Sequence, residues 1–145
     1  MSVELLGSCL CNRVQFRVTG KPVLMGYCHC SRCRKSGGSA FLANIVVRRA
    51  DFSWIRGEDL VSTYIADDVP NGLKRSFCRN CGSYLGEPYA EGKYIPLAAG
   101  TLNSDPGIRP SFHEFTAHKA AWFEITDDLK QYDEDPGFTS ENSDA

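Results

Sequence analysis

Cys28-His29-Cys30-Ser31-Arg32-Cys33 is the stretch that decides the fold, because it places three sulfur atoms within six residues. Such a density of soft ligands is typical of a metal centre or of redox-active thiols. Two further pairs of cysteines flank it, Cys9 with Cys11 before it and Cys78 with Cys81 after it. The total of seven fits badly with a fully paired set of disulfides, so the sequence predicts metal ligation.

The seven sulfurs can divide into four and three. A structural zinc takes four protein ligands, whereas a catalytic zinc commonly keeps three and leaves one position open. An alternative stays open on spacing alone, in which Cys30 and Cys33 join Cys78 and Cys81 as a zinc ribbon. We predict the first division, with two zinc ions per chain: a structural one at Cys9, Cys11, Cys78 and Cys81, and a catalytic one at Cys28, Cys30 and Cys33.

The chemistry expected of the three-cysteine site follows from its ligands. Zinc at such a site would hold a thiol substrate as its thiolate, and it could also polarise a carbonyl oxygen. Sulfur-rich ligation makes zinc a weaker Lewis acid than ligation by histidine. The site therefore favours a reaction of thiols over peptide hydrolysis.

Composition is that of an ordinary globular protein, with 42% hydrophobic and 23% charged residues in 145. The net charge of -2 argues against a nucleic-acid partner that depends on bulk positive charge. The amino terminus lacks the pattern of a signal peptide, and no apolar run approaches the length of a spanning helix. We expect a cytoplasmic protein with no membrane or nucleic-acid partner.

The chain is predicted to be mainly β, because no stretch of helical length has an amphipathic period. Residues 127–145 are acidic and poor in aliphatic side chains, and we expect them to be solvated. The prediction is a single zinc domain over residues 1–136 and an acidic tail over 137–145. Trp54, Trp122 and Phe123 are expected in the core. The expected strands cover residues 14–18, 23–27, 40–47, 52–55, 61–65, 73–77, 84–89, 94–99 and 112–118, and residues 122–125 are expected to close the core.

Local patterns suggest how the cysteine pairs are presented. On an extended segment, Cys9 and Cys11 would share one face and Leu10 would be buried on the other. Cys78-Arg79-Asn80-Cys81-Gly82 is typical of a zinc knuckle, in which the glycine tolerates a positive φ.

The order of these motifs resembles the glutathione-dependent formaldehyde-activating enzyme family, also called the CENP-V/GFA family. The resemblance rests on Gly7-Ser8-Cys9-Leu10-Cys11, on Cys28 to Lys35 and on Phe77 to Gly82, and it continues through His113, Lys119 to Phe123 and Asp127 to Leu129. It runs from about Gly7 to Pro136. Two positions depart from the family pattern, His118 before the lysine and Ala121 before the tryptophan.

The resemblance implies an Mss4-like fold, a β-tent of packed antiparallel sheets stapled by zinc. It also implies the same division of the cysteines into a structural and a catalytic zinc site. The implied activity is that of a carbon–sulfur lyase, which forms S-hydroxymethylglutathione from glutathione and formaldehyde. The expected partners are thus a small thiol such as glutathione and a small aldehyde.

Basic residues near the central cluster are candidates for binding substrate carboxylates. Arg32, Lys35 and Lys119 are the candidate contacts, and Arg34 is a fourth cation nearby. Solvated surface charge is the simpler interpretation for each of them.

The three histidines have simple structural interpretations. His29 should point away from the metal, as the residue between two ligands on an extended segment. His113 and His118 are predicted on one strand, facing opposite sides, and either could shuttle a proton.

Two other classes of function fit the same residues. One is a binding module of Mss4-like type, in which both zinc ions are structural and the partner is a protein. The other is a redox sensor in which Cys28, Cys30 and Cys33 stay free of metal and form reversible disulfides.

Overall fold

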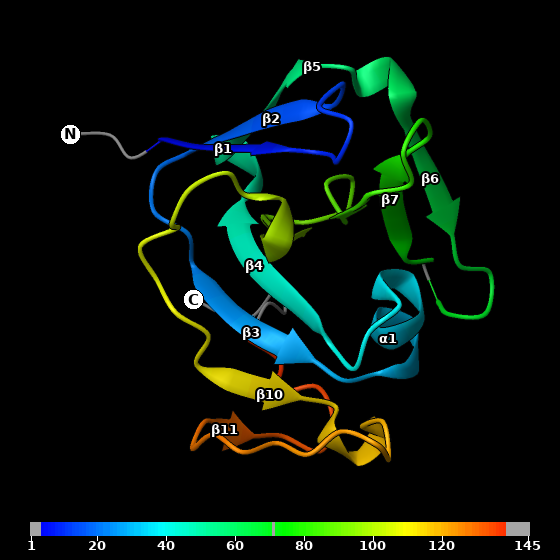
Figure 1. Ribbon diagram of the computed structural model, residues 1–145, viewed down its shortest axis with the longest axis vertical. Helices are drawn as coiled ribbons and strands as arrows, with labels where there is room; N and C mark the ends of the chain where they lie inside the picture. The colour runs from blue at the N-terminus through cyan, green and yellow to red at the C-terminus, as the bar shows by residue number, and fades with distance from the viewer. Residues whose placement is uncertain (1–3, 71, 139–145) are drawn as a thin grey trace.

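The structure is a computed structural model that describes residues 4–70 and 72–138. Figure 1 shows its strands and its short helix α1. The elements are β1 Glu4–Ser8, β2 Gln15–Thr19, β3 Leu24–Cys28, α1 Ser31–Gly37, β4 Leu42–Arg48, η1 Arg49–Asp51, β5 Phe52–Arg56, η2 Glu58–Leu60, β6 Val61–Ile65, β7 Lys74–Cys78, β8 Tyr84–Gly86, β9 Tyr94–Ala98, η3 Ala99–Thr101, β10 Phe112–Glu114, η4 Thr116–His118 and β11 Lys130–Gln131.

These strands form two sheets. The small sheet has the order β1-β2-β5, and the large one has the order β11-β10-β3-β4-β9-β8-β7-β6. Neighbouring strands are antiparallel except that β10 runs parallel to both β3 and β11. The predicted mainly β architecture of packed, largely antiparallel sheets is thus confirmed.

The hydrophobic core lies between the small sheet and the centre of the large one. Phe16 and Val18 alternate with polar residues along β2 and are 1% exposed, as the period of two predicts. Ile45 and Val47 on β4 meet them from the large sheet. The cluster also includes Leu5, Ile95 and Leu97.

The same alternation gives the large sheet a second face that lines a cavity. On β3, Leu24 and Gly26 point to the cavity, while Met25 packs against the core. On β4, Val46 lines the cavity between the core residues Ile45 and Val47. Residues opposite one another in the register therefore extend this wall across neighbouring strands.

Gly26 makes room for β10. A Cβ atom built on Gly26 would lie 2.4 Å from the ring of Phe112. The missing side chain therefore lets the Phe112 ring lie flat against β3 at the cavity wall.

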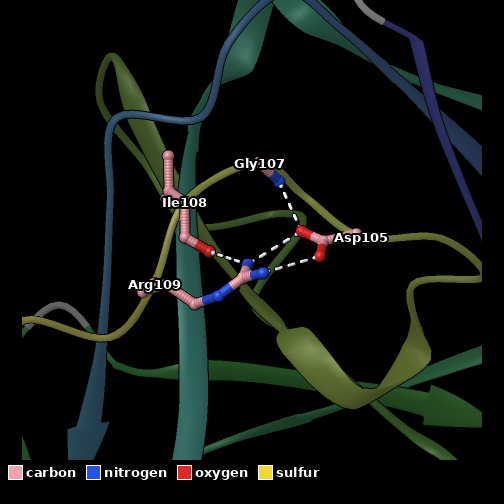
Figure 2. A network of polar contacts seen from close by, with 4 residues as sticks. All are labelled: Asp105, Gly107, Ile108 and Arg109. Atoms are coloured by element: carbon pink, nitrogen blue, oxygen red, sulfur yellow. Dashed lines mark hydrogen bonds and ion pairs between the residues drawn. The ribbon is translucent and has the colours of Figure 1, made fainter.

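The loop before β10 is fixed by one acidic side chain, Asp105 (Figure 2). Its carboxylate accepts a hydrogen bond from the Gly107 amide at 2.8 Å and two from the Arg109 guanidinium, each at 2.8 Å. Arg109 also donates to the Ile108 carbonyl oxygen at 2.9 Å. Arg109 lowers the pKa of the Asp105 carboxyl to about 2, so this turn keeps its charge pair over the ordinary pH range.

Several predictions of secondary structure were wrong. Helix α1 was not expected; it begins after its N-cap residue Cys30 and ends before its C-cap residue Gly38, whose φ is 64°. At seven residues it is too short to show an amphipathic period. The predicted strand 112–118 ends at Glu114 because Phe115 adopts a φ of 57°. Trp122, expected in the core, is 76% exposed.

Part of the acidic end packs onto the domain, contrary to the expectation for residues 127–138. The Tyr132 amide donates to the His113 carbonyl oxygen at 2.8 Å, and the Phe138 ring lies 5.0 Å from that of Phe112. A hydrophobic contact and a backbone hydrogen bond hold this segment against β10. The rest of the predicted tail, residues 139–145, lies outside the described residues.

Within residues 4–70 and 72–138, no helix is long and apolar enough to cross a membrane.

Candidate metal centre and adjoining cavity

Four cysteines from opposite parts of the chain converge on one point. The sulfurs of Cys9, Cys11, Cys78 and Cys81 all lie within 4.8 Å of one another. Cys9 and Cys11 are 3.5 Å apart, and Cys11 and Cys78 are 3.9 Å apart. Ligands about 2.3 Å from a tetrahedral metal ion are separated by about 3.8 Å, so the four sulfurs fit such an ion.

Cys9 and Cys11 reach this point through a turn and not through the extended segment expected. The Asn12 amide donates to the Cys9 carbonyl oxygen at 3.0 Å, and Asn12 has a φ of 67°. Leu10 is 85% exposed, so its predicted burial was wrong. The turn brings both sulfurs inward and leaves the residue between them at the surface.

Cys78 and Cys81 lie in the knuckle that the sequence predicts. Gly82 has a φ of 80°, and its amide donates to the Cys78 carbonyl oxygen at 2.8 Å. Burial raises the pKa of the Cys78 thiol to about 11, although the backbone amides of Cys81 and Asn80 act to lower it. A metal ion at this knuckle would therefore have to displace the Cys78 proton, as metal binding does at thiolate sites in general.

The other three cysteines form a second group. Cys28 ends β3, Cys30 is the N-cap of α1 and Cys33 lies inside the helix. Their sulfurs lie within 4.8 Å of one another, and the Cys33 amide donates to the Cys30 sulfur at 3.3 Å. The structure therefore separates Cys30 and Cys33 from Cys78 and Cys81, unlike the zinc-ribbon alternative.

Within the three-cysteine group, the pKa values of Cys30 and Cys28 are shifted in opposite directions. Hydrogen bonds from Cys28 and Cys33 hold the pKa of Cys30 far below that of an ordinary thiol. The same contact with Cys30, together with burial, raises the pKa of Cys28. Metal binding at the group would have to displace the remaining thiol protons, as it does at thiolate sites in general.

Behind this group lies a chain of two histidines and an aspartate. The Nε2 atom of His29 is 2.8 Å from Nδ1 of His113, whose Nε2 is 3.0 Å from the Asp127 carboxylate. His29 is fully buried, and burial, followed by the electrostatic effects of His113, Lys119 and Arg34, lowers its pKa to about 4. His29 therefore stays neutral at physiological pH.

The protons of this chain can be assigned from its acceptors. A carboxylate only accepts, so Nε2 of His113 carries the hydrogen toward Asp127. If each imidazole carries one proton, Nδ1 of His113 accepts from Nε2 of His29, and Nδ1 of His29 is left as a bare lone pair. That Nδ1 atom has no hydrogen-bond partner among the described residues.

A cavity of about 520 Å³ adjoins the three-cysteine group. Its floor is the outer face of the large sheet, and its polar groups include Arg75, Glu87 and Glu114. Burial raises the pKa of Glu87, and burial together with the charge of Asp135 raises that of Glu114 to about 7. The cavity thus offers sulfur ligands, a cation and two half-buried carboxyl groups to a small polar molecule.

Of the four basic residues predicted near the central cluster, only Arg32 lies in the lining of this cavity. Arg32 lines the cavity and forms an ion pair of 2.8 Å with Asp68. Lys35 is exposed on α1 and lies outside the cavity lining, while Arg34 donates to the His29 carbonyl oxygen at 3.4 Å. Lys119 donates to the carbonyl oxygens of Ala120 and Phe123, at 3.3 and 2.5 Å, beside a separate surface hollow.

Sequence reasoning missed Arg75, Glu87 and Glu114 as neighbours of the site, and it named Asp127 only as part of the resemblance. Each of the first three is a single charged residue with no motif around it. Arg75 had one usable signal, because it lies three residues before Cys78 on the strand that leads to the knuckle. The side of the sheet that it faces, however, depends on pairings that the sequence does not show.

Comparisons with known proteins agree with this geometry. A family model described as "Glutathione-dependent formaldehyde-activating enzyme" matches residues 4–118. A Halomonas elongata protein named "Putative glutathione-dependent formaldehyde-activating enzyme" is 32% identical over 126 residues, which cover 83% of this chain and 80% of that protein. An uncharacterized lyase of Schizosaccharomyces pombe is 29% identical over 90 residues, which cover 62% of this chain and 61% of the lyase.

A solved structure shares the fold. It is a crystal structure of a Rhodobacter sphaeroides protein with 23% sequence identity and a TM-score of 0.52, covering 72% of this chain and 91% of its own. The family model extends over most of the chain and includes both groups of cysteines. The chain therefore belongs to the glutathione-dependent formaldehyde-activating enzyme family.

Proposed function

We propose that this chain is a zinc-dependent carbon–sulfur lyase that makes and breaks the adduct of a thiol and an aldehyde, with glutathione and formaldehyde as its substrates. One observation carries the proposal. Cys28, Cys30 and Cys33, whose sulfurs lie together, line part of a cavity of about 520 Å³. Within residues 4–70 and 72–138, no fourth His, Cys, Asp or Glu side chain joins the three sulfurs.

The reaction is balanced without an oxidant or a cofactor that carries electrons. The thiol sulfur forms a bond to the carbonyl carbon, the π electrons of the C=O bond pass to oxygen, and the proton of the thiol ends on that oxygen. The reverse reaction breaks the carbon–sulfur bond and returns thiol and aldehyde. Holding both reactants in one small cavity removes much of the entropic barrier to their encounter.

Both groups of cysteines suit zinc, since thiolates are soft ligands that favour it over magnesium or calcium. Zinc held by three thiolates supplies an open coordination position that favours the thiolate form of a thiol. The residues around the sulfurs set the polarity and the charge of the cavity. Leu24, Val46 and Phe112 give the cavity an apolar wall that displaces water, and Arg75 places positive charge beside Cys33.

The four-cysteine group has a structural role in this proposal. It joins the turn after β1 to the end of β7, and four thiolates leave no position for a substrate. We also propose a reducing compartment such as the cytoplasm, in which seven thiols stay available to metal.

The test is the rate at which zinc-loaded protein interconverts glutathione, formaldehyde and S-hydroxymethylglutathione, followed by NMR exchange spectroscopy with ¹³C-labelled formaldehyde. Cys30→Ser is the informative variant. Serine is a preferred N-cap residue, so helix α1 keeps its cap while the ligand sulfur is lost. The variant should lose one zinc ion per chain and nearly all acceleration.

Ser39→Ala is the matched control, because Ser39 is exposed beyond α1 and lies outside the cavity lining. It should keep both the zinc content and the rate. Full acceleration by Cys30→Ser would rule out the catalytic assignment. Zinc-loaded wild-type protein that gives no acceleration would instead favour a binding module, and sulfurs that stay metal-free and oxidise reversibly would favour a redox sensor.

A further inference from the structure

Strand β7 reaches both groups of cysteines. Its last residue, Cys78, belongs to the four-cysteine group, and Arg75 near its start contacts the three-cysteine group. Figure 1 shows the start of β7 beside α1, the helix that contains Cys33. Because residues 75 and 78 are an odd number of positions apart, their side chains leave the strand on opposite faces.

Arg75 is held in place by three contacts. Its Nη2 donates to the Cys33 sulfur at 3.6 Å, and its Nη1 donates to the Tyr84 hydroxyl at 3.0 Å. The guanidinium also lies over the Tyr84 ring, 5.9 Å from the ring centre. Among the described residues, no carboxylate lies within 4.0 Å of the guanidinium.

Arg75 is a half-buried cation, and the Cys33 sulfur, as a metal-bound thiolate, would be its anionic partner. A divalent ion with three thiolates carries a net charge of about -1, and the guanidinium brings the assembly near zero. A neutral assembly accepts another anionic ligand more readily than a negative one does.

The second arginine at the cavity differs in this respect. Arg32 is 2.8 Å from the Asp68 carboxylate, which neutralises its charge locally, and its side chain is 34% exposed. Because its charge is paired with that of Asp68, Arg32 has little electrostatic effect on the sulfurs. The cation that acts on the sulfurs is Arg75.

We propose that Arg75 is a positioning residue that tunes the three-cysteine site through its hydrogen bond to the Cys33 sulfur, so that the metal ion held there binds a substrate thiolate more strongly. A donor to a ligating sulfur withdraws electron density from the metal–sulfur bond and leaves the ion a better acceptor. Groups that hydrogen-bond to metal ligands typically change metal affinity by about 10- to 100-fold. This inference rests on the proposed function, since it concerns the same site.

Cobalt(II) tests the inference, because its ligand-field and sulfur-to-metal charge-transfer bands report the ligand set directly. The full chain is loaded with cobalt, the bands are recorded, and the protein is titrated with glutathione. Arg75→Gln should move the charge-transfer band of the three-cysteine site to lower energy and weaken glutathione binding by about 10-fold. Competition with a chromophoric chelator should show weaker affinity for one of the two cobalt ions.

Two further variants keep the test decisive if Arg75→Gln folds poorly. Arg75→Lys keeps the charge without the paired donors and should give a band between those of the wild type and Arg75→Gln. Tyr84→Phe removes the hydroxyl that holds Nη1 and should give a smaller shift in the same direction. Arg32→Gln is the matched control for cavity charge, and its cobalt spectrum should equal that of the wild type.

An unchanged spectrum and unchanged glutathione affinity in folded Arg75→Gln would overturn the inference, and so would an equal shift in Arg32→Gln. These outcomes are separable from failure of the proposed function. If the wild type gives no turnover but its cobalt bands respond to Arg75 as stated, the tuning role stands and the lyase proposal fails. If the wild type gives turnover but Arg75→Gln leaves the cobalt bands unchanged, only the tuning role fails.

Discussion

His29 and His113 face each other in the protein interior, with Nε2 of the first 2.8 Å from Nδ1 of the second, although 84 positions separate them in the chain. Both side chains are at most 2% exposed. The contact joins the loop between two predicted metal ligands to β10, and Asp127 extends it to the surface. The histidine between Cys28 and Cys30 is therefore anchored away from the sulfurs, as the sequence predicts, but by a partner that the sequence did not reveal.

His113→Leu should lower the free energy of unfolding by about 1–3 kcal/mol, because it leaves Nε2 of His29 buried without an acceptor. Urea unfolding of metal-loaded protein measures the loss. His118→Gln is the control, since His118 pairs with Glu134 at an exposed position and its loss should change the free energy by less than about 0.5 kcal/mol. Equal effects of the two variants would contradict the role given to the buried pair.

Gly26→Ala should destabilise the protein by about 1–3 kcal/mol, because the new Cβ would lie 2.4 Å from the Phe112 ring. Adding Phe112→Leu should recover part of the loss, as the smaller side chain vacates that space. Gly100→Ala, whose Cβ would meet nothing within 4 Å, should be nearly neutral. Thermal unfolding of the wild type, the two single variants and the double variant measures these changes. A neutral Gly26→Ala would show that β10 packs differently on β3.

Glu114→Gln should make stability less dependent on pH. The folded chain holds the Glu114 proton up to a pKa of about 7, whereas the unfolded chain releases it near 4.3. Since the folded state binds more protons between these values, ionisation of Glu114 lowers stability progressively as pH rises from about 4.3 to 7. The variant lacks this loss.

The advantage of Glu114→Gln over the wild type should be small at pH 4.5 and grow to about 1–3 kcal/mol at pH 8. Paired urea titrations at each pH measure it. An advantage that shrinks as pH rises would mean that Glu114 is charged in the folded protein at a lower pH than its burial implies.

Loss of the two groups of cysteines should have different consequences. Cys78→Ser should abolish cooperative folding or lower Tm steeply, because Cys78 is fully buried and its group ties β7 to the turn after β1. Cys30→Ser should leave the circular dichroism spectrum intact while metal content falls by one ion per chain. Metal analysis beside thermal unfolding checks both. A stable Cys78→Ser with one metal lost would remove the structural role of the four-cysteine group.

Local patterns predicted some elements well and failed at others for identifiable reasons. The alternation of Phe16 and Val18 marked β2 because one face of that strand is buried and the other is solvated. Helix α1 escaped notice because it is short and is defined by its cap residues, Cys30 and Gly38, more than by a hydrophobic face. Leu10 was misplaced because an exposed turn with Asn12 at positive φ presents two sulfurs as well as a strand does.

The sequence by itself determined the number and local spacing of the sulfur ligands and the positive φ of Gly82, because turn geometry and ligand spacing are set over a few residues. Tertiary structure alone decided that Arg75 reaches Cys33, that His29 meets His113, and that the outer face of the large sheet forms a cavity beside three thiols. These contacts depend on the strand order β11-β10-β3-β4-β9-β8-β7-β6. That order comes from the joint burial of distant apolar faces, which no local pattern encodes.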